Sequence, residues 1–181
     1  VEIVEESVAT PEQLAMRELN AGVYCFQATW LWEHVDQIPL TRSKGEYYLT
    51  DMVGMAVGAG LSVKAVICGD PEEALGVNTR VHLAEAERRL RRRINEHWMM
   101  AGVTMVDPST TYIDTEVVIG RDTTLQPHTH LRGNTTVGER CVIGPNTVIE
   151  DSAVGDRCAV LASVVEQAVM ENGSDVGPFA H

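Results

Sequence analysis

The sequence predicts two architectures in one chain, an α/β segment and a parallel β-helix, with a long helix joining them. Three observations support this prediction. Helix-like and strand-like segments alternate over the first eighty residues, helical spacing continues from residue 79 to residue 101, and aliphatic residues then recur every six positions. A six-residue period with glycine after the aliphatic is typical of coils that bury their aliphatic residues by stacking on one another.

The hexapeptide repeat is the strongest of these signals. Val137, Ile143 and Ile149 follow one another at six-residue intervals, and Gly120 and Gly138 lie eighteen residues apart, which corresponds to one triangular coil. The register is expected to shift near residue 151. A second series, one register over, consists of Val142, Val148, Val154 and Val160, and the repeat is expected to resume after the shift as Val164, Met170 and Val176. The alternative, a β-sandwich, predicts alternation with period two and hairpin turns.

The alternating elements of the first eighty residues are typical of an α/β domain. Thr10 followed by Pro11 predicts a helix N-terminus, because threonine caps a helix and proline suits its first position. Pro39 predicts the end of another helix. Helices are expected at 29–37 and 44–60, and strands at 1–4, within 18–26 and at 62–68.

A long helix is expected from residue 79 to residue 101, with Gly102 at its C-terminal end. Its arginines between residues 88 and 93 allow two interpretations, a phosphate-binding patch or a solvated face that pairs with nearby glutamates. Glu85 with Arg89 and Glu87 with Arg91 have the spacing for such pairs. The apolar stripe of the helix consists of Leu83, Ala86, Leu90, Ile94, Trp98 and Ala101.

The composition indicates a soluble cytoplasmic protein. The formal net charge of −12 argues against a nucleic-acid partner, because phosphate binding needs clustered lysines and arginines. The four cysteines are scattered and are expected to be reduced core residues. No apolar run of about 18 residues and no signal-peptide pattern occurs, so no membrane partner is expected.

Several short motifs occur in an order that resembles one bacterial enzyme family. They are ATPEQ at 9–13, ELNAG at 18–22, KGEYYLTD at 44–51, GVNTR at 76–80, AGVT at 101–104 and DP at 107–108. Together with the repeat they resemble the bifunctional N-acetylglucosamine-1-phosphate uridylyltransferase / glucosamine-1-phosphate N-acetyltransferase family, over essentially the whole chain. The resemblance implies an α/β nucleotidyltransferase-like partial domain at 1–82, a linker helix at 83–106, and the first coils of a left-handed parallel β-helix at 107–181.

The resemblance also implies the chemistry. The family makes UDP-N-acetylglucosamine for the cell wall by uridylyl transfer from UTP to N-acetylglucosamine 1-phosphate and acetyl transfer from acetyl-CoA to glucosamine 1-phosphate. By similarity, Glu5 and Asn20 bind the sugar, and Tyr48 and Thr50 line the sugar pocket. By the same similarity, Asn78 contacts the nucleotide and supplies a ligand to Mg²⁺. Carboxylate and carboxamide groups suit sugar hydroxyls, and a carboxamide oxygen suits Mg²⁺. Without the resemblance, Glu5, Asn20 and Asn78 read as an exposed carboxylate, a turn residue and a helix cap.

Departures from the family pattern limit these expectations. No glycine-rich nucleotide loop precedes Val1, and the family's catalytic histidine and acetyl-CoA residues lie in coils that follow the GPFA motif at 177–180. Ala21 stands where threonine or serine is expected, and His181 is not expected to be the catalytic base. We therefore expect no catalytic residue and no activity in this chain by itself, and an exposed sheet edge and apolar surface within 1–82. The resemblance itself implies a homotrimer formed through the β-helix.

Other interpretations remain open. A related sugar-1-phosphate nucleotidylyltransferase with a β-helix tail is one, and a non-catalytic trimerisation scaffold is another. His128 and His130 share a strand face and suggest zinc binding between subunits, whereas Pro127 and Gly133 suggest a surface turn.

Overall fold

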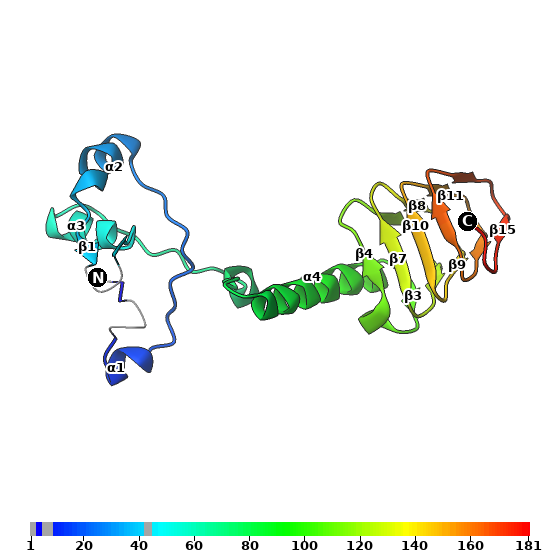
Figure 1. Cartoon of the computed structure of the whole chain (residues 1–181), viewed down its shortest axis with the longest axis horizontal. Coiled ribbons are helices and arrows are strands. Elements are labelled where there is room, and N and C mark those ends of the chain that lie inside the picture. Colours follow the sequence, from blue (N-terminus) through cyan, green and yellow to red (C-terminus); the bar gives the residue numbers. More distant parts are fainter. Residues whose placement is uncertain (1–2, 5–8, 42–44) are drawn as a thin grey trace. The chain divides into compact units, whose positions relative to one another are not determined.

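The computed structural model describes residues 3–4, 9–41 and 45–181, and it contains two compact units, Val1–Gly76 and Val77–His181 (Figure 1). The first unit holds short helices and one small sheet, and the second holds a long helix followed by a β-helix. Across the described ranges, every helix is too short or too polar to reach from one side of a bilayer to the other.

Short helices dominate the first unit. Thr10 caps the first of them as predicted, since its Oγ1 accepts a hydrogen bond from Gln13 N (3.3 Å) and the Gln13 side chain accepts one from Thr10 N (2.8 Å). The helix expected at 29–37 is present and ends before Pro39. The elements are α1 (Pro11–Leu14), α2 (Ala28–His34), η2 (Val35–Gln37), β1 (Leu40–Thr41), β2 (Glu46–Tyr47), α3 (Asp51–Gly58) and η3 (Pro71–Ala74).

The prediction of strands at 1–4, within 18–26 and at 62–68 is wrong for the described residues. No strand is present at 3–4, 18–26 or 62–68, and positions 1 and 2 lie outside the described ranges. A strand exists only beside a hydrogen-bonded neighbour, and no described segment pairs with 62–68. Val66 and Ile67 are each 91% exposed there, which agrees with the apolar surface expected within 1–82.

The helix expected at 44–60 is shorter than predicted. It begins only at Asp51, because β2 pairs with β1 in an antiparallel ladder just before it; residue 44 lies outside the described ranges. Met52, Val53 and Ala56 form its buried face, so the predicted helical spacing is correct over the part that is helical.

In the second unit, α4 (Arg80–Met100) confirms the helix predicted at 79–101. Thr79 caps it, because its Oγ1 accepts a hydrogen bond from His82 N (3.1 Å). Gly102 follows the helix in a left-handed conformation (φ 104°), as a C-terminal glycine commonly does.

Only the second half of α4 packs against the β-helix. Leu83 and Leu90 are 57% and 51% exposed, so the predicted apolar stripe is wrong there, whereas Ile94 and Trp98 pack on the core. The arginines pair with glutamates of the same helix, which supports the solvated-face interpretation. The pairs are Arg88 and Arg89 with Glu85, Arg91 with Glu87, and Arg92 with Glu96.

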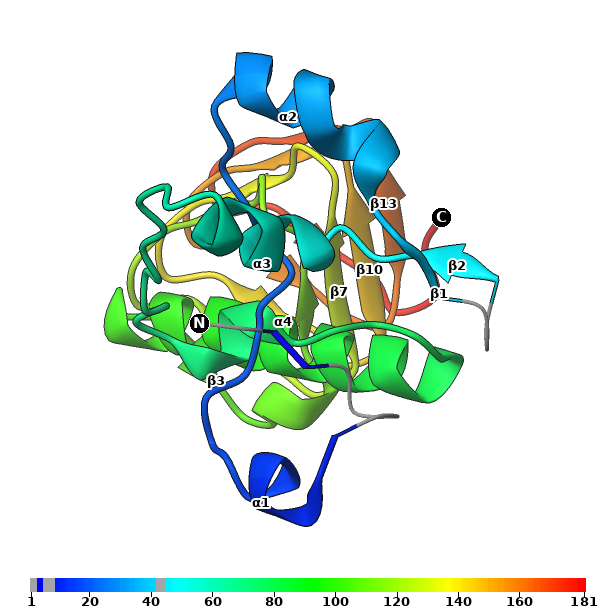
Figure 2. The same ribbon diagram turned by 90° about the vertical axis from the view of Figure 1, so that its left-hand side faces the viewer.

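Short parallel strands then form the β-helix, whose three sheets are the β4 face (β4-β7-β10-β13), the β5 face (β5-β8-β11-β14) and the β3 face (β3-β6-β9-β12-β15). Figure 2 shows β7, β10 and β13 side by side in this order. The elements are β3 (Thr104–Met105), η4 (Pro108–Thr110), β4 (Tyr112–Ile113), β5 (Val118–Ile119), β6 (Thr124–Leu125), β7 (Thr129–Arg132), β8 (Thr136–Val137), β9 (Val142–Ile143), β10 (Thr147–Glu150), β11 (Ala153–Val154), β12 (Ala159–Val160), β13 (Val164–Glu166), β14 (Val169–Met170) and β15 (Asp175–Val176).

One row of aliphatic side chains fills the coil interior. The row is Ile113, Ile119, Leu125, Leu131, Val137, Ile143, Ile149, Val154, Val160, Val165 and Met170, each at most 8% exposed. The interval from Ile149 to Val154 is five residues, which confirms the register shift near residue 151.

The prediction that Val142, Val148, Val154 and Val160 form a series of their own is wrong. Val154 and Val160 continue the inward row, whereas Val142 points outward and is 47% exposed. After the shift, Val165 and not Val164 takes the inward position. The physical reason is that the coils shorten, with register partners on the β3 face spaced by 18, 17 and then 16 residues. A fixed period of six therefore cannot follow the row past the shift.

Glycines allow close contact between coils at the turn after the β5 face. A Cβ on Gly120 or Gly138 would lie 2.5 or 2.6 Å from the backbone carbonyl carbon of the glycine in the next coil, and one on Gly155 would lie 2.8 Å from a backbone nitrogen. A larger residue at these positions would therefore push the coils apart.

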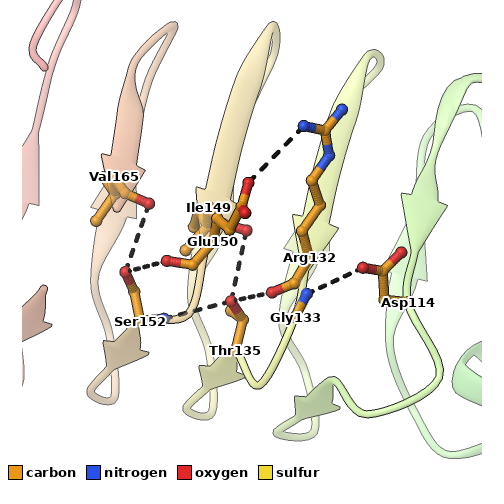
Figure 3. Close-up of polar contacts among 8 residues, drawn as sticks. All are labelled: Asp114, Arg132, Gly133, Thr135, Ile149, Glu150, Ser152 and Val165. Carbon is orange, nitrogen blue, oxygen red and sulfur yellow. Dashed lines mark hydrogen bonds and ion pairs between the residues drawn. The ribbon is translucent and has the colours of Figure 1, made fainter. Parts of the chain in front are cut away.

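Buried hydroxyls join the coils at the turn between the β4 and β5 faces (Figure 3). Thr135 Oγ1 donates to Arg132 O (2.6 Å) and accepts from Ser152 N (3.4 Å). Ser152 Oγ donates in turn to Glu150 O (2.7 Å). Each hydroxyl satisfies backbone groups of its own coil and of the neighbouring coil, which explains why small polar residues alternate with the aliphatic row.

Candidate functional site

Asn20, one of the two predicted sugar residues, lies on the surface of the first unit in a local turn. Its Oδ1 accepts a hydrogen bond from Gly22 N (3.2 Å), and its Nδ2 donates to the Tyr24 hydroxyl (2.5 Å). The contact with Gly22 matches the turn interpretation, and the two contacts together hold the carboxamide in one orientation. Glu5, the other predicted sugar residue, lies outside the described residues.

Tyr48 and Thr50 lie together on the turn that leads into α3, and both are half-buried. The Tyr48 hydroxyl donates to the Glu46 carboxylate (3.1 Å). Thr50 occupies the N-terminal position of α3, but its side chain does not cap the helix. The structure therefore brings these two pocket candidates into one turn, in the same unit as Asn20.

Asn78 is exposed in the second unit, directly before α4. Its backbone N donates to His82 Nδ1 (3.4 Å), and the cap of α4 is Thr79, so the cap interpretation of Asn78 is wrong. Within the described ranges, no three His, Cys, Asp or Glu side chains gather closely enough to hold a metal ion. One carboxamide oxygen fits Mg²⁺ as a single ligand beside waters and phosphates, which is how this ion is commonly bound.

His128 and His130 do not share a strand face. His128 lies on a turn with φ 58°, which supports the surface-turn interpretation, whereas His130 lies on β7. The His130 ring stacks on the Tyr112 ring, with centroids 4.5 Å apart and an interplanar angle of 2°. Burial lowers the pKa of His130 below its ordinary value of 6.5, and the charges of Arg132 and His128 act in the same direction.

The stack continues onto α4. Arg91 Cζ lies 4.3 Å from the centroid of the Tyr112 ring. The Tyr112 ring therefore contacts both the Arg91 guanidinium and the His130 imidazole. Such cation–π contacts contribute about 0.5–1 kcal/mol at exposed sites. Among the arginines of α4, Arg91 thus attaches the helix to the β4 face. The spacing of residues along α4 does not predict this role.

Asn95 makes the second attachment, and sequence reasoning missed it. It is 1% exposed, and its Nδ2 donates to Pro108 O (2.8 Å) and Thr111 O (3.1 Å). In a later coil, the carbonyl of Ser163 accepts an N–H group from Val148 of the coil before it. Thr111 holds the corresponding position at the edge strand of the β4 face, so the Asn95 amide replaces a missing coil.

A signal for Asn95 existed in the sequence, because an asparagine sits between Ile94 and Trp98 on the apolar side of the helix. A buried polar side chain requires partners, and here they are backbone carbonyls. Asn95 Oδ1 is the one buried side-chain oxygen or nitrogen without a partner among the described residues.

A hollow of about 320 Å³ lies where α4 meets the first coil. Its lining consists of Arg93, Ile94, His97, Trp98, Asp114 and Thr115. The Asp114 carboxylate already accepts a hydrogen bond from Gly133 N (2.9 Å; Figure 3). One carboxylate of the lining is therefore already engaged by the backbone of the next coil.

The cysteines divide into two pairs. Cys141 and Cys158 are buried in adjacent coils, and burial raises the pKa of the Cys141 thiol, as expected for core residues. Cys25 and Cys68 are exposed, so the prediction that all four are core residues is wrong for these two. All four are free thiols.

Comparison with known proteins identifies the repeat. A family model described as "Bacterial transferase hexapeptide (six repeats)" matches residues 116–151. With the stacked parallel coils, this match confirms the predicted left-handed β-helix of the hexapeptide type and its transferase class.

The whole chain also matches curated proteins named "Bifunctional protein GlmU". It is 46% identical over 179 residues to that of Exiguobacterium sibiricum, covering 99% of this chain and 40% of the relative. It is 47% identical over 181 residues to that of Caldanaerobacter subterraneus subsp. tengcongensis, covering 100% and 39%, and 46% identical over 180 residues to that of Rhodococcus opacus, covering 99% and 36%. The resemblance predicted from the motifs is confirmed, and the chain spans about two fifths of the length of these relatives.

Proposed function

We propose that this chain is a segment of a GlmU-type bifunctional transferase that makes UDP-N-acetylglucosamine in the cytoplasm. The observation that carries the proposal is the match at 46–47% identity over nearly all of this chain. One proposed activity is uridylyl transfer from UTP to N-acetylglucosamine 1-phosphate. The other is acetyl transfer from acetyl-CoA to glucosamine 1-phosphate.

In the proposed uridylyl transfer, a phosphate oxygen of the sugar phosphate attacks the α-phosphorus of UTP, and pyrophosphate leaves. Asn20 and Glu5 hold sugar hydroxyls, Tyr48 and Thr50 line the sugar pocket, and Asn78 contributes a ligand to Mg²⁺. The metal, when bound, neutralises phosphate charge during the displacement. The contacts from Gly22 and to Tyr24 support the role of Asn20, because they orient its carboxamide before a sugar arrives.

In the proposed acetyl transfer, the β-helix supplies the scaffold on which copies of the chain assemble into a homotrimer. Its hexapeptide match to bacterial transferases supports this part of the proposal. We place the catalytic histidine and the acetyl-CoA residues outside these 181 residues.

A chimera tests the function. Residues 1–181 would replace the matching two fifths of the Exiguobacterium sibiricum protein, and pyrophosphate release and CoA release would be measured separately. Both activities are expected to remain. In this chimera, Asn20→Ala is expected to lower kcat/KM for uridylyl transfer about 10- to 100-fold, the effect of losing one or two polar substrate contacts, and to leave acetyl transfer unchanged. Asn134→Ala, an exposed asparagine of the β-helix, is the matched control.

A chimera that folds but releases neither product would contradict the proposal and favour the trimerisation scaffold. Release of pyrophosphate alone would favour a nucleotidylyltransferase with a β-helix tail. The 181-residue chain by itself is expected to release neither pyrophosphate nor CoA, and product formation by it would contradict our placement of the missing groups.

A further inference from the structure

We infer that Tyr24 is a positioning residue for the sugar site, and that a column of four stacked rings sets its hydroxyl against Asn20. The ring column consists of Tyr24, Phe26, Trp30 and His34. The inference rests on the sugar-binding role of Asn20 proposed above. It adds how the Tyr24 hydroxyl is itself held in place, and which polar atoms of Asn20 remain for a sugar.

The ring column runs from the segment before α2 into the helix. The ring centroids of Tyr24 and Phe26 lie 5.9 Å apart and those of Phe26 and Trp30 lie 6.3 Å apart, with an interplanar angle of 26° in both pairs. Trp30 and His34 are one turn apart on α2, and their ring centroids lie 4.7 Å apart at 21°. All three separations fall within the range in which aromatic rings attract one another.

The last ring of the column is held by the backbone of α2. His34 Nδ1 donates to Trp30 O (2.8 Å), because a carbonyl oxygen can only accept a hydrogen bond. This bond fixes the His34 imidazole against the Trp30 ring. The ring column therefore begins on a helix, and each ring restricts the rotation of the next one as far as Tyr24.

Burial separates the ring column from the side chains around it. All four of its rings are half-buried. By contrast, Val23 is 87% exposed, Cys25 is exposed, and Trp32 on α2 is 72% exposed. Exposure alternates from residue 23 to residue 26, so Tyr24 and Phe26 share the side of the segment that is packed. The position of the Tyr24 ring is thus set by packing, and its hydroxyl is a fixed partner for Asn20.

The Tyr24 hydroxyl determines which polar atoms of Asn20 remain available. A carboxamide has two N–H groups and an oxygen with two lone pairs. One N–H is used by the Tyr24 hydroxyl, and one lone pair is used by Gly22 N. Within residues 9–41 and 45–181, no further hydrogen bond reaches the Asn20 side chain. One N–H therefore remains for the oxygen of a sugar hydroxyl, and one lone pair remains to accept a sugar O–H.

Without the tyrosine hydroxyl, the carboxamide is held by Gly22 N alone. The last torsion of an asparagine side chain is broad, so a single contact of 3.2 Å leaves the amide freer to turn. A sugar would then have to order Asn20 as it binds, and this cost weakens binding. Because Asn20 holds sugar hydroxyls and not the reacting atoms, the loss should appear in KM for the sugar phosphate and not in kcat.

The test uses the chimera described above and compares Tyr24→Phe with Tyr47→Phe. Both substitutions remove a tyrosine hydroxyl from the first unit, but Tyr47 is 65% exposed and lies outside the ring column. We expect Tyr24→Phe to raise KM for N-acetylglucosamine 1-phosphate about 3- to 10-fold, the effect of one neutral hydrogen bond. KM for UTP and the rate of CoA release should stay unchanged. Tyr47→Phe should change none of these values.

A double-mutant cycle distinguishes positioning from a structural role. In a chimera that already carries Asn20→Ala, Tyr24→Phe should have no further effect on KM for the sugar phosphate, because no carboxamide remains to be positioned. A purely structural loss would instead add to the loss from Asn20→Ala. Tyr24→Phe keeps the ring and its stacking, so the variant is expected to fold.

The ring column is tested on α2. Trp30→Leu removes a ring from the column, and Trp32→Leu removes the exposed tryptophan of the same helix. We expect Trp30→Leu to raise the same KM about two- to fivefold, as the loss of stacking predicts, and to have no effect beside Asn20→Ala. Trp32→Leu should leave KM unchanged. If far-UV circular dichroism shows that Trp30→Leu unfolds the first unit, Phe26→Leu, which removes a smaller ring, takes its place.

The outcomes separate this inference from the proposed function. If Asn20→Ala leaves uridylyl transfer unchanged, the sugar-binding role of Asn20 is wrong, and this inference is wrong with it. A loss with Asn20→Ala but none with Tyr24→Phe, or an equal loss from Tyr24→Phe with and without Asn20, overturns the positioning role alone. If Trp30→Leu and Trp32→Leu have the same effect, the ring column does not set the hydroxyl.

Discussion

Replacement of Asn95 by alanine tests how α4 terminates the β-helix. The Asn95 amide donates to Pro108 O and Thr111 O, at the edge where the β4 face has no further coil. Alanine retains the helix, because it has the highest helix propensity, but it cannot donate a hydrogen bond. The substitution therefore removes the edge contact without a change in the helix itself.

The expected cost follows from the three polar atoms involved. The Thr111 carbonyl is left buried and unpaired, at about 1–3 kcal/mol, and the Pro108 carbonyl, which is nearer to solvent, adds about 1 kcal/mol. Removal of the unpartnered Asn95 Oδ1 returns about 1 kcal/mol, because that oxygen is already desolvated without a bond. The net loss of unfolding free energy is about 2 kcal/mol.

Urea unfolding of the full chain, followed by far-UV circular dichroism, measures this loss. Glu96→Ala is the matched control, since it shortens a 62% exposed side chain on the same helix and should change the unfolding free energy by less than about 0.5 kcal/mol. Amide hydrogen exchange should also become faster in β4 and not in β9. An Asn95→Ala protein as stable as the control would refute the idea that this amide caps the coil.

Two further predictions concern the coil interior and its outer stack. Gly138→Ala should destabilise the chain by about 1–3 kcal/mol, because its Cβ would lie 2.6 Å from a backbone carbon of the next coil, whereas Gly54→Ala in α3 meets nothing within 4 Å and should be neutral or stabilising; equal urea midpoints would contradict the clash. For His130, the folded pKa lies below the ordinary value of 6.5, so its contribution to stability is present above pH 6.5 and is lost as the pH falls toward the folded pKa. His130→Gln should therefore lose less stability than the wild type between pH 7.5 and pH 5.5, and an identical loss in both proteins would contradict this reasoning.

The β-helix could be predicted from the sequence because each coil repeats the same local requirement. An aliphatic residue fills the interior of its own coil, so the period of the sequence is the period of the structure until the coils shorten after Ile149. A strand in the first unit instead requires a second strand that hydrogen-bonds to it. The alternation at 62–68 carries no information about such a partner. Periodicity predicts which side chains share a face, but it does not show whether another strand lies beside them.

The candidate sugar and nucleotide residues came from motifs alone, and periodicity contributed nothing to them. Asn20 and Asn78 are exposed polar residues, which composition and spacing cannot distinguish from ordinary surface residues. Asn95 is missed by the stripe Leu90, Ile94 and Trp98 for the opposite reason, because periodicity counts only apolar residues and Asn95 is a polar residue on the same side of α4. A polar residue inside an apolar stripe therefore indicates a buried contact to be identified.

The glycines of the β5 face are explained by coil packing alone. Gly120 and Gly138 are required by the approach of the next coil, whether or not another chain ever contacts them. Their flat surface is a consequence of coil packing and is not evidence for an interface. Coil packing does not require the 81% exposure of Val169, so the inward and outward positions of this face answer to different constraints. Gly138→Ala should accordingly lower stability even in a monomer.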